Sequence, residues 1–350
     1  MSFAKSKFKH KSLPVNKLGL TYRDYEGAIS TLCAGCGHDS ISSAIVHACA
    51  ELSIEPHKIV KMSGIGCSSK APNYFLSNSH GFNTVHGRMP SVTTGANLAN
   101  KDLTYLAMSG DGDSASIGLG QFAHVVRRQL NMVYMVANNG VYGLTKGQLA
   151  ATSDKGVKNK VGDTSLFNDI DLCTMALQLG ASFVARCFSG DKKQLIPIIK
   201  AAIAHQGFAF IDIISPCVTF NNHAGSTRSY DYVQEHVTSG AITDFVPVRD
   251  EISQDIPEGQ FEDVCLHDGS IMRIHKIDKD YDTSNRIKAM TDVEMHKEKG
   301  EILTGLLYLD PTARTYHELN NTSDVPLNTV KQDLLCPGER VLSTINDSFR

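Results

Sequence analysis

The sequence predicts an α/β fold in which a central parallel sheet is flanked by helices. Short apolar runs of strand length, nearly unbroken by polar residues, alternate with amphipathic segments of helix length. Unbroken apolar runs are typical of strands buried on both faces, and strand-helix alternation is typical of a parallel sheet. Ligands bind such sheets at the carboxyl ends of the strands, so we expect the functional residues there.

Five strands and four helices are predicted in order along the chain. The strands are 58–62, 103–108, 132–137, 182–187 and 208–214, and the helices are 40–51, 116–129, 167–179 and 191–205. Asp191 is expected to be an N-cap, because its carboxylate can accept a hydrogen bond from a free helix amide. Gly180 and Gly207 follow helices and are expected at C′ positions.

Composition and charge narrow the class of protein. The chain has 350 residues, of which 41% are hydrophobic, and a formal net charge of -3, so neither a nucleic-acid nor a membrane partner is expected. No apolar run approaches the roughly 20 residues of a spanning helix, and the basic N-terminus lacks the apolar region of a secretory signal. We therefore expect a cytoplasmic protein.

The distribution of charged and apolar residues along the chain predicts three regions. Residues 1–30 are predicted to form an N-terminal arm, and residues 31–237 the α/β domain. After Val237 charged residues of both signs become frequent and buried-strand runs become rare, apart from "EILTGLLYLD". Residues 238–350 are therefore predicted to be a C-terminal extension that contacts a partner or a second copy.

Two polar turns follow neighbouring predicted strands. "GDGD" comes after strand 103–108 and opens the next helix, and "NNGVYG" follows strand 132–137. Asp111 and Asn139 are therefore expected to face a common point at one sheet edge. Their oxygens suit Mg²⁺, which usually keeps a phosphate among its ligands. Gly110 and Gly112 allow a close backbone approach, and helix amides favour an anion, so the pattern predicts a site for a metal and a diphosphate.

The paired turns resemble the thiamine diphosphate signature, in which GDG precedes NN. Here 25 residues lie between Gly112 and Asn138. The chain has no Walker A loop, and "GLG" at 118–120 lacks the third glycine of a dinucleotide fingerprint. The resemblance implies that Asp111, Asn139 and the carbonyl of Val141 hold Mg²⁺. An Asp-Gly turn or an NNG loop alone is usually only a loop, and the interpretation depends on the pair.

Four cysteines lie in Gly, Ser or Pro turns, and two of them follow predicted strands. They are Cys33 and Cys36 in "CAGCGH", Cys67 in "GIGCSSK" and Cys217 in "SPCVTF". Because cytosolic thiols stay reduced, clustered cysteines are tested first as ligands, and four thiolates can hold a [4Fe–4S] cluster. Structural zinc and cysteines without a ligand role remain alternatives, although zinc sites usually have two short pairs.

Other cysteine chemistry fits this pattern less well. Gly37 follows the CxxC in place of the histidine of a c-type haem site, and a thioredoxin-like pair would use only two of the four thiols. The remaining cysteines lie in or beside apolar runs and are expected to be buried thiols; they are Cys49, Cys173, Cys187, Cys265 and Cys336.

A set of ordered motifs over roughly residues 32–237 resembles the β subunits of the 2-oxoacid:ferredoxin oxidoreductases. The motifs are "CAGCGH", "GIGCSS", "HGR", "TTGANLAN", "GDGD", "NNGVYGLTKGQ" and "SPCVTFN". The resemblance implies a thiamine-diphosphate-binding domain in which Cys33, Cys36, Cys67 and Cys217 ligate a [4Fe–4S] cluster. It also implies that the diphosphate and metal are surrounded by Gly64, Ile65, Gly66, Cys67, His86, Gly87, Gly110, Asp111, Gly112, Asp113, Asn139, Val141, Tyr142, Gly143, Leu144 and Thr145.

The same resemblance implies the chemistry and the partners. Thiamine diphosphate stores the electron pair left when CO₂ leaves a 2-oxoacid, a cluster passes the electrons singly to ferredoxin, and coenzyme A takes the acyl group. Thiamine enzymes use a glutamate from a pyrimidine-binding domain, and this chain shows no second domain of that type. We therefore expect an α subunit to supply the glutamate in an αβ or (αβ)₂ complex, and this chain to be inactive alone.

The choice of substrate depends on a few basic side chains. Lys70 lies three residues after Cys67, and Lys146 lies just beyond residues 139–145, the predicted metal loop. Either could pair with the distal carboxylate of 2-oxoglutarate, whereas pyruvate would leave a buried ammonium unpaired at a cost of about 1–3 kcal/mol. Arg88 is a third candidate. For the lysines the alternative is a solvated charge, and Arg88 could be a structural donor.

Two histidines could act at the same site. His38 and His86 lie in turns from which either ring could bond the diphosphate or a substrate oxygen. Each could equally stabilise its own turn.

The resemblance and the lysines together predict a β subunit that acts on 2-oxoglutarate. It would form succinyl-CoA and CO₂, or run in reverse in reductive carbon fixation. Pyruvate or a broad range of 2-oxoacids is the nearest alternative. A non-redox thiamine decarboxylase or carboligase subunit would keep the GDG and NN turns and use the cysteines structurally, and a zinc-stabilised assembly protein is a third possibility.

Overall fold

An eight-stranded sheet forms the centre of the molecule in the computed structural model. The structure describes residues 10–159, 162–220, 228, 233, 237–239, 261–265, 271–275, 281–336 and 338–350. The strand order is β2-β1-β3-β4-β8-β7-β12-β9. Neighbouring strands run parallel except for the β12–β7 pair, which is antiparallel. The predicted α/β class with a central, mostly parallel sheet is confirmed.

The elements have the following bounds. The sheet strands are β1 (Ile59–Ser63), β2 (His80–Asn83), β3 (Thr104–Gly110), β4 (Met132–Asn138), β7 (Phe183–Phe188), β8 (Phe208–Ile214), β9 (Val237–Ser239) and β12 (Ile302–Leu309). Two small hairpins are β5 (Val141–Tyr142) with β6 (Gln148–Leu149), and β10 (Phe261–Cys265) with β11 (Ile271–His275). The α-helices are α1 (Gly37–Glu51), α2 (Met89–Ala99), α3 (Leu119–Arg127), α4 (Leu172–Gln178), α5 (Lys192–Ala204), α7 (Arg286–Glu298), α8 (Tyr316–Leu319), α9 (Gln332–Leu335) and α10 (Gly338–Ser348). Shorter helical turns are η1 (Tyr22–Tyr25), η2 (Pro56–Lys58), η3 (Ser68–Asn73), η4 (Gly112–Ile117) and η5 (Leu327–Thr329).

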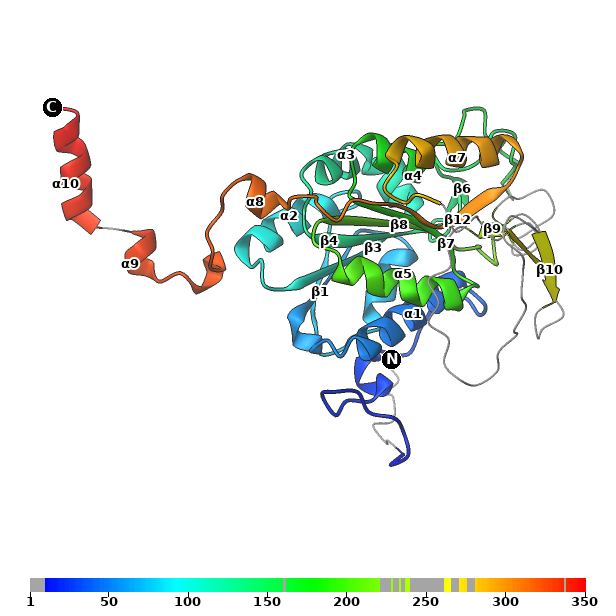
Figure 1. Cartoon of the computed structure of the whole chain (residues 1–350), viewed down its shortest axis with the longest axis horizontal. Coiled ribbons are helices and arrows are strands. Elements are labelled where there is room, and N and C mark those ends of the chain that lie inside the picture. The colour runs from blue at the N-terminus through cyan, green and yellow to red at the C-terminus, as the bar shows by residue number, and fades with distance from the viewer. Residues whose placement is uncertain are drawn as a thin grey trace.

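Helices cover both faces of the sheet, and the strands therefore serve two cores. In Figure 1, α1 and α5 lie on one face, and α3, α4 and α7 lie on the other. Side chains alternate along β4, so that Val133 and Met135 join the core under α1 and α5, whereas Met132 and Tyr134 join the core under α3 and α4. This double burial explains why the central strands read as unbroken apolar runs.

The predicted helix ends are largely confirmed. The Asp191 carboxylate accepts a hydrogen bond from the Gln194 amide at 3.1 Å at the start of α5. Gly180 lies at C′ of α4 with positive φ, as predicted, whereas Gly207 also has positive φ but lies two residues beyond the His205 C-cap of α5, so its predicted C′ position is wrong. The helix predicted over 116–129 instead begins with the π-helical turn η4 directly after Asp111, and α3 follows from Leu119.

The C-terminal extension contributes to the sheet, which the sequence did not predict. β12 pairs with β7, and Ala289 and Val293 of α7 are buried beside Leu303 and Leu307 of β12. The run "EILTGLLYLD" is thus a sheet strand. The boundary expected at residue 237 does not separate this part of the extension from the α/β domain.

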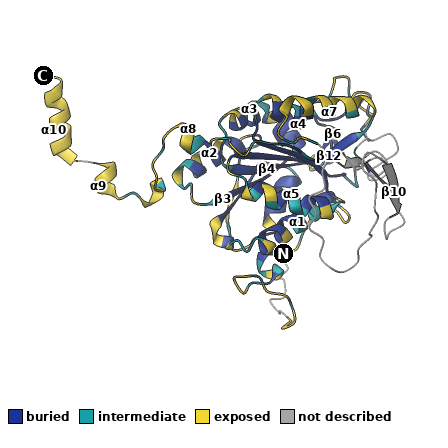
Figure 2. Cartoon of the chain, viewed as in Figure 1, coloured by how far each residue is buried: buried dark blue, intermediate teal, exposed yellow. Residues whose placement is uncertain are grey.

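The two ends of the described chain differ in how they contact this body. The segment expected as an N-terminal arm packs against it: Tyr25 is fully buried, and Glu26 forms a β-bridge with Phe75. The C-terminal segment projects away after α8 (Figure 1), and neither α9 nor α10 contains a buried residue (Figure 2). In the described part of the chain, no helix is long and apolar enough to cross a membrane.

Candidate functional site

Four parallel strands deliver the predicted site residues to one edge of the sheet. β1, β3, β4 and β8 are consecutive neighbours in the sheet. The chain leaves them toward Cys67, Asp111, Asn139 and Cys217, respectively. The predicted convergence of the two thiol-bearing turns with the two polar turns is therefore a property of the fold.

Asp111 is a buried carboxylate held by the loop after β4, residues 139–145, which is named the metal loop for the metal ligands predicted on it. The Gly140 amide donates to its Oδ2 at 3.0 Å and the Asn139 amide to its Oδ1 at 3.4 Å, and the hydroxyl of Thr152 also donates to Oδ2. Burial raises the pKa of Asp111 to about 6. The hydrogen bonds from Thr152 and from the Asn139 amide oppose this rise in pKa, and the positive charge of Arg228 opposes it further. The Arg228 guanidinium also pairs with Asp154 at 4.0 Å. A divalent cation would offset the burial of this charge, so the donor set suits Mg²⁺.

The two asparagines of the NN turn have different partners. Asn138 donates from Nδ2 to Oδ1 of Asp212 at 3.0 Å, inside the sheet. Asn139 bonds toward the loop, because its Oδ1 accepts the Val141 amide at 3.0 Å. An amide oxygen has a second lone pair, so Asn139 can still ligate a metal. The second asparagine, not the first, is the one whose side chain lies on the metal loop.

Tyr142 packs directly over the GDG turn. Its hydroxyl donates to the carbonyl of Gly112 at 3.1 Å, and a Cβ on Gly112 would lie 2.6 Å from the tyrosine ring. Only glycine therefore allows this approach. Further along the loop, Leu144 and Thr145 are exposed, and the Thr145 hydroxyl donates to Gln148 Oε1 at 2.6 Å. The end of the loop is thus open to solvent in this chain.

The thiols of Cys67 and Cys217 meet at the metal loop. A Cβ built on Gly143 would lie 3.6 Å from Sγ of Cys67 and 3.7 Å from Sγ of Cys217. The Thr219 hydroxyl, two residues beyond Cys217, donates to Sγ of Cys33 at 3.6 Å. Residues far apart in sequence thus bring three of the predicted thiol ligands to one region, next to the loop that carries Asn139.

Electrostatics connects the fourth thiol to the others. Burial raises the pKa of Cys36 to about 12, and the neighbouring Cys217 and Cys67 add to the rise. The pKa of Cys67 is also raised, first by burial and then by Cys217 and Cys33. Thiolates this close repel each other, so a cationic group that binds all four would stabilise their ionised form.

Among the described residues, no three His, Cys, Asp or Glu side chains come together as a site for one metal ion.

The other cysteines are mostly core residues, as predicted. Cys49, Cys173 and Cys187 are fully buried. Cys336 is exposed, so the prediction that it is a buried thiol is wrong: its apolar neighbours belong to α9, which has no buried residue. The side chain of Cys265 lies outside the described residues.

Asp113 faces away from Asp111 and bonds to the neighbouring turns. Its Oδ1 accepts the Gly87 amide at 2.7 Å and the Ile65 amide at 3.3 Å, and its Oδ2 accepts the hydroxyl of Ser109. Nδ1 of His86 lies against Oδ1, although the ring is not aligned as in a good hydrogen bond. Four groups thus surround one carboxylate, which is 2% exposed.

The two lysines predicted to select the substrate each follow, by three residues, one member of the contact between Cys67 and Gly143. Lys70 is half-buried in η3, three residues after Cys67, and contributes to its electrostatic environment. Lys146 is exposed, three residues after Gly143, with a φ of +81°.

The two other candidates differ in their accessibility. Arg88 is exposed at the N-cap position of α2. His38 is 1% exposed, its Nδ1 is 2.7 Å from the Ser215 hydroxyl, and burial lowers its pKa to about 4. A neutral, enclosed ring that joins α1 to the turn after β8 favours the structural role of His38 over contact with a substrate.

Two contributions to the site could not be seen in the sequence. Thr152 contacts Asp111 from the segment after β6, and its carbonyl accepts Arg228 at 3.2 Å. Asp212, to which Asn138 bonds, is itself held by Arg186, whose Nε donates to Oδ2 of Asp212 at 3.0 Å. A buried Asp in the middle of an apolar strand and a buried Arg in the next one were the only signals that could have revealed this ion pair.

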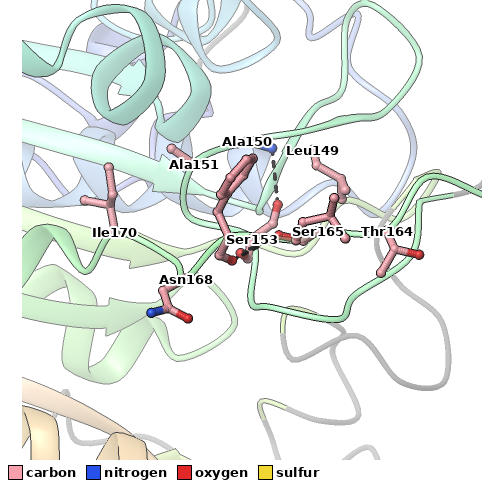
Figure 3. A pocket seen from close by; sticks show the side chains of 10 residues that line it. Leu149, Ala150, Ala151, Ser153, Thr164, Ser165, Asn168 and Ile170 are labelled. Carbon is pink, nitrogen blue, oxygen red and sulfur yellow. Dashed lines mark hydrogen bonds between the residues drawn. The ribbon is translucent and has the colours of Figure 1, made fainter.

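A cavity of about 440 Å³ lies on the outer side of the segment that contains Thr152. It is lined by Leu149, Ala150, Ala151, Ser153, Thr164, Ser165, Leu166, Phe167, Asn168 and Ile170 (Figure 3). The Ala150 amide and the Ser153 hydroxyl both donate to the carbonyl of Gly140, which ties this wall to the metal loop. No ionisable side chain lines the cavity.

The fold and the polar sheet edge define a thiamine-dependent class. Residues 64–213 match the family described as "Thiamine pyrophosphate enzyme, C-terminal TPP binding domain". These residues include the GDG and NN turns and end at β8, just before Cys217.

Individual relatives narrow this class. The chain is 44% identical over 191 residues to the 2-oxoacid:ferredoxin oxidoreductase subunit beta of Saccharolobus solfataricus, and the match covers 54% of this chain and 63% of that relative. It is 39% identical over 197 residues to the 2-oxoglutarate synthase subunit KorB of Methanocaldococcus jannaschii, covering 56% of this chain and 72% of the relative. The chain belongs to the β-subunit family of the 2-oxoacid:ferredoxin oxidoreductases.

A solved structure is similar over most of the chain. It is a 2-oxoglutarate:ferredoxin oxidoreductase from Magnetococcus marinus with 2-oxoglutarate, coenzyme A and succinyl-CoA bound. The TM-score is 0.70 at 32% sequence identity, and the match covers 86% of this chain and 89% of the other. The likeness extends beyond the 64–213 segment.

Proposed function

We propose that this chain is the β subunit of a 2-oxoglutarate:ferredoxin oxidoreductase. It would bind thiamine diphosphate with Mg²⁺ and a [4Fe–4S] cluster, and act with an α subunit, coenzyme A and ferredoxin. The products would be succinyl-CoA and CO₂, and the reaction would be reversible. Family membership and the likeness to the Magnetococcus enzyme support the substrate and the co-substrate.

One contact carries the redox part of this proposal. Gly143 lies against the thiols of both Cys67 and Cys217, four residues after Asn139 on the same loop. The proposed cluster ligands and the proposed metal ligands are thereby joined by a single short segment. A non-redox thiamine subunit would have no need to bring free thiols to its metal loop.

The residues of this chain would bind and orient the reactants. When bound, thiamine diphosphate supplies a sink for the electron pair released with CO₂, and the cluster accepts electrons singly. Asp111, Asn139 and the Val141 carbonyl would hold the metal, and the packing of Tyr142 on Gly112 keeps the GDG backbone close to the diphosphate position. Preorganised ligands of this kind lower the reorganisation needed on binding.

Lys70 and Lys146 would recognise the distal carboxylate of the substrate. Their positions, each three residues from the contact of Cys67 with Gly143, support this role. An ammonium that pairs with a second carboxylate discriminates against a 2-oxoacid that lacks it, because the unpaired charge is then left partly desolvated. The proposal therefore predicts faster turnover of 2-oxoglutarate than of pyruvate.

Anaerobic co-purification with the α subunit tests the proposal. We expect a brown complex that contains iron and sulfide in equal amounts, retains thiamine diphosphate, and reduces a viologen dye with 2-oxoglutarate only when coenzyme A is present. Equal or higher rates with pyruvate would contradict the substrate assignment. A colourless complex without iron would contradict the redox assignment.

Matched variants separate the two cofactors. Asp111→Asn removes the charged metal ligand and should weaken Mg²⁺-dependent thiamine diphosphate binding by at least tenfold while leaving iron in place. Cys217→Ala should lose iron, whereas Cys336→Ala, at an exposed cysteine on the C-terminal segment, should keep it. Isothermal calorimetry and iron analysis of the purified complexes give these two results independently.

A further inference from the structure

The carboxylate of Asp113 is the point at which three turns of the site are joined. The turns follow β1, β2 and β3, and they carry Ile65, Gly87 and Asp113, respectively. The amides of Ile65 and Gly87 both donate to Oδ1 of Asp113, at 3.3 and 2.7 Å. The Thr84 amide still donates to the Ser63 carbonyl at 2.8 Å, and beyond that bond the side-chain bonds of Asp113 link the three turns.

The first turn is shaped to receive this carboxylate. A Cβ on Gly64 would lie 1.9 Å from Oδ2 of Asp113, so any other residue there would displace it. Asn83 adds a second tether to the same turn, donating from Nδ2 to the Gly64 carbonyl at 2.8 Å. Gly64 thus has a steric reason to be glycine that is independent of its φ angle.

The burial of Asp113 indicates a demanding position rather than a surface contact. Its side chain is 2% exposed, and a buried carboxylate is stable only when several donors surround it. Here two backbone amides and the Ser109 hydroxyl supply hydrogen bonds. Replacing the carboxylate would therefore release the turns on both sides at once.

His86 is placed by the same group. Its Nδ1 is buried and lies against Oδ1 of Asp113, while its ring, 30% exposed overall, packs edge-on to Tyr142 with centroids 6.2 Å apart. The contact with Oδ1 of Asp113 and the edge-on packing against Tyr142 together fix the position of the ring. The ring thereby stands between Asp113 and the tyrosine that covers the GDG turn.

We propose that Asp113 is a positioning residue that holds the turns after β1, β2 and β3 in register and sets His86 beside Tyr142 at the edge of the cofactor site. It acts through Ile65, Gly87 and His86, and it needs no contact with the cofactor. Loss of its acceptor oxygen loosens the walls around the diphosphate position, whereas loss of its charge alone leaves the two amide bonds in place. This role rests on the proposed function, because it requires that the site bind thiamine diphosphate.

The test compares three variants of the anaerobic complex with its α subunit. Asp113→Ala removes every acceptor. Asp113→Asn keeps an oxygen for the amides of Ile65 and Gly87. Asn285→Ala is the matched control, because it removes an N-cap whose oxygen accepts the Lys288 amide at 3.0 Å on α7, outside the turns that form the site. The readouts are the thiamine diphosphate dissociation constant by calorimetry in the presence of Mg²⁺, the midpoint of thermal unfolding, iron content, and kcat and KM for 2-oxoglutarate.

The expected result has three parts. Asp113→Ala raises the dissociation constant at least tenfold and lowers kcat at saturating cofactor. Asp113→Asn restores the dissociation constant to within about threefold of wild type, because the amide bonds are kept. Asn285→Ala lowers the unfolding midpoint while the dissociation constant and kcat stay at their wild-type values. Rescue by asparagine is what distinguishes positioning of the turns from a general loss of stability.

Opposite results overturn the proposal. A dissociation constant for Asp113→Ala within twofold of wild type would do so, as would an Asp113→Asn variant that binds as weakly as the alanine variant. If Asp113→Ala does not fold, the asparagine variant alone decides between the two outcomes. A wild-type complex that binds no thiamine diphosphate would overturn the proposed function itself and this role with it, whereas normal wild-type binding with insensitive variants overturns only the role of Asp113.

Discussion

The two adjacent asparagines of the NN turn bond to different parts of the structure. Asn138 bonds to Asp212, which belongs to a buried network in which Arg186 contacts both Asp212 (3.0 Å) and Asp171 (2.5 Å). Asn139, one residue later, bonds within the loop through Val141. Asn138 thus anchors the loop to the sheet, whereas the side chain of Asn139 bonds within the loop itself.

His205 should make the stability of the fold sensitive to mild acid. Burial lowers its pKa, Asp310 partly opposes this, and Nε2 lies 2.8 Å from the Ser182 hydroxyl. Below the ordinary pKa of histidine, about 6.5, the unfolded chain takes up a proton before the folded chain does, so stability is lost as the pH falls. The unfolding midpoint of His205→Gln should therefore fall less than that of wild type between pH 7.5 and pH 5.5.

A second histidine provides the control for this measurement. His57 has a side chain that is 66% exposed, so His57→Gln removes a histidine without disturbing the buried packing. Circular dichroism melts of the three proteins at matched ionic strength give the comparison. Parallel profiles for wild type and His205→Gln would contradict the assignment.

At the scale of single residues, the sequence predicted identities better than roles. Asp111 and the four cysteines could be predicted as ligands because they lie in turns and because each has a defined ligand chemistry. Thr152 could not be found, since nothing local in the sequence links it to Asp111, 41 residues away. His38 shows the converse problem: a histidine in a turn can be enclosed or accessible, and only the packing of α1 against the turn after β8 decides which.

At the scale of elements, a buried lysine holds the turn that carries a proposed cluster ligand. Lys61 of β1 donates from Nζ to the carbonyls of Pro72 (2.7 Å), Phe75 (2.9 Å) and Leu76 (3.0 Å). These carbonyls lie at and just beyond the end of η3, the helical turn that follows Cys67. One side chain thus satisfies the free acceptors of an element end that has no helix to follow it.

Removing this amine should destabilise the protein clearly. Lys61→Met keeps most of the apolar stem and leaves three carbonyls without their donor, a loss on the order of 2 kcal/mol in the free energy of unfolding. Part of this loss is offset because burial, which lowers the pKa of Lys61 to about 8, no longer opposes a charge. Urea unfolding at pH 7 measures the difference.

The control for this change is a lysine with a surface partner. Lys200 donates to Glu51 at 2.7 Å, with side chains 20% and 35% exposed. Partly exposed ion pairs contribute at most about 1 kcal/mol, so Lys200→Met should change the free energy of unfolding much less than Lys61→Met does. Equal effects of the two substitutions would show that the three carbonyls find other donors.

Burial also decides which strands could be predicted from the sequence, and each strand that was missed has a physical reason. The central strands could be predicted because double burial requires apolar residues at every position. β2 was missed because all four of its residues are exposed and its sequence, "HGFN", has no apolar run. The sheet membership of β12 was missed because the pairing of a strand with a distant partner leaves no local signal.

At the scale of the whole molecule, residues 331–350 do not pack against the rest of the described chain, which we call the body. α9 and α10 contain no buried residue, and the large apolar side chains in and directly after them, among them Leu334, Leu342 and Phe349, are exposed. A short helix without packing contributes little to the stability of a domain. Figure 2 shows this segment exposed along its length.

Deleting residues 331–350 should therefore leave the body intact. We expect the free energy of unfolding to change by no more than about 0.5 kcal/mol, because no buried contact is lost. The radius of gyration from small-angle X-ray scattering should fall, since the deleted segment projects from the body (Figure 1). A large drop in the unfolding midpoint would show that α9 and α10 pack on the body in solution.

The antiparallel strand β12 has a consequence for synthesis on the ribosome. β7 lies between β8 and β12 in the described sheet, and β12 ends at Leu309, long after β8 ends at Ile214. At translation speeds of about 5–20 residues per second, the hydrogen-bonding edge of β7 stays open for about 5–20 s after β8 has been made. Nascent chains stalled in this interval should be the most prone to aggregate and the most dependent on chaperones, because an open strand edge is a template for pairing with another chain.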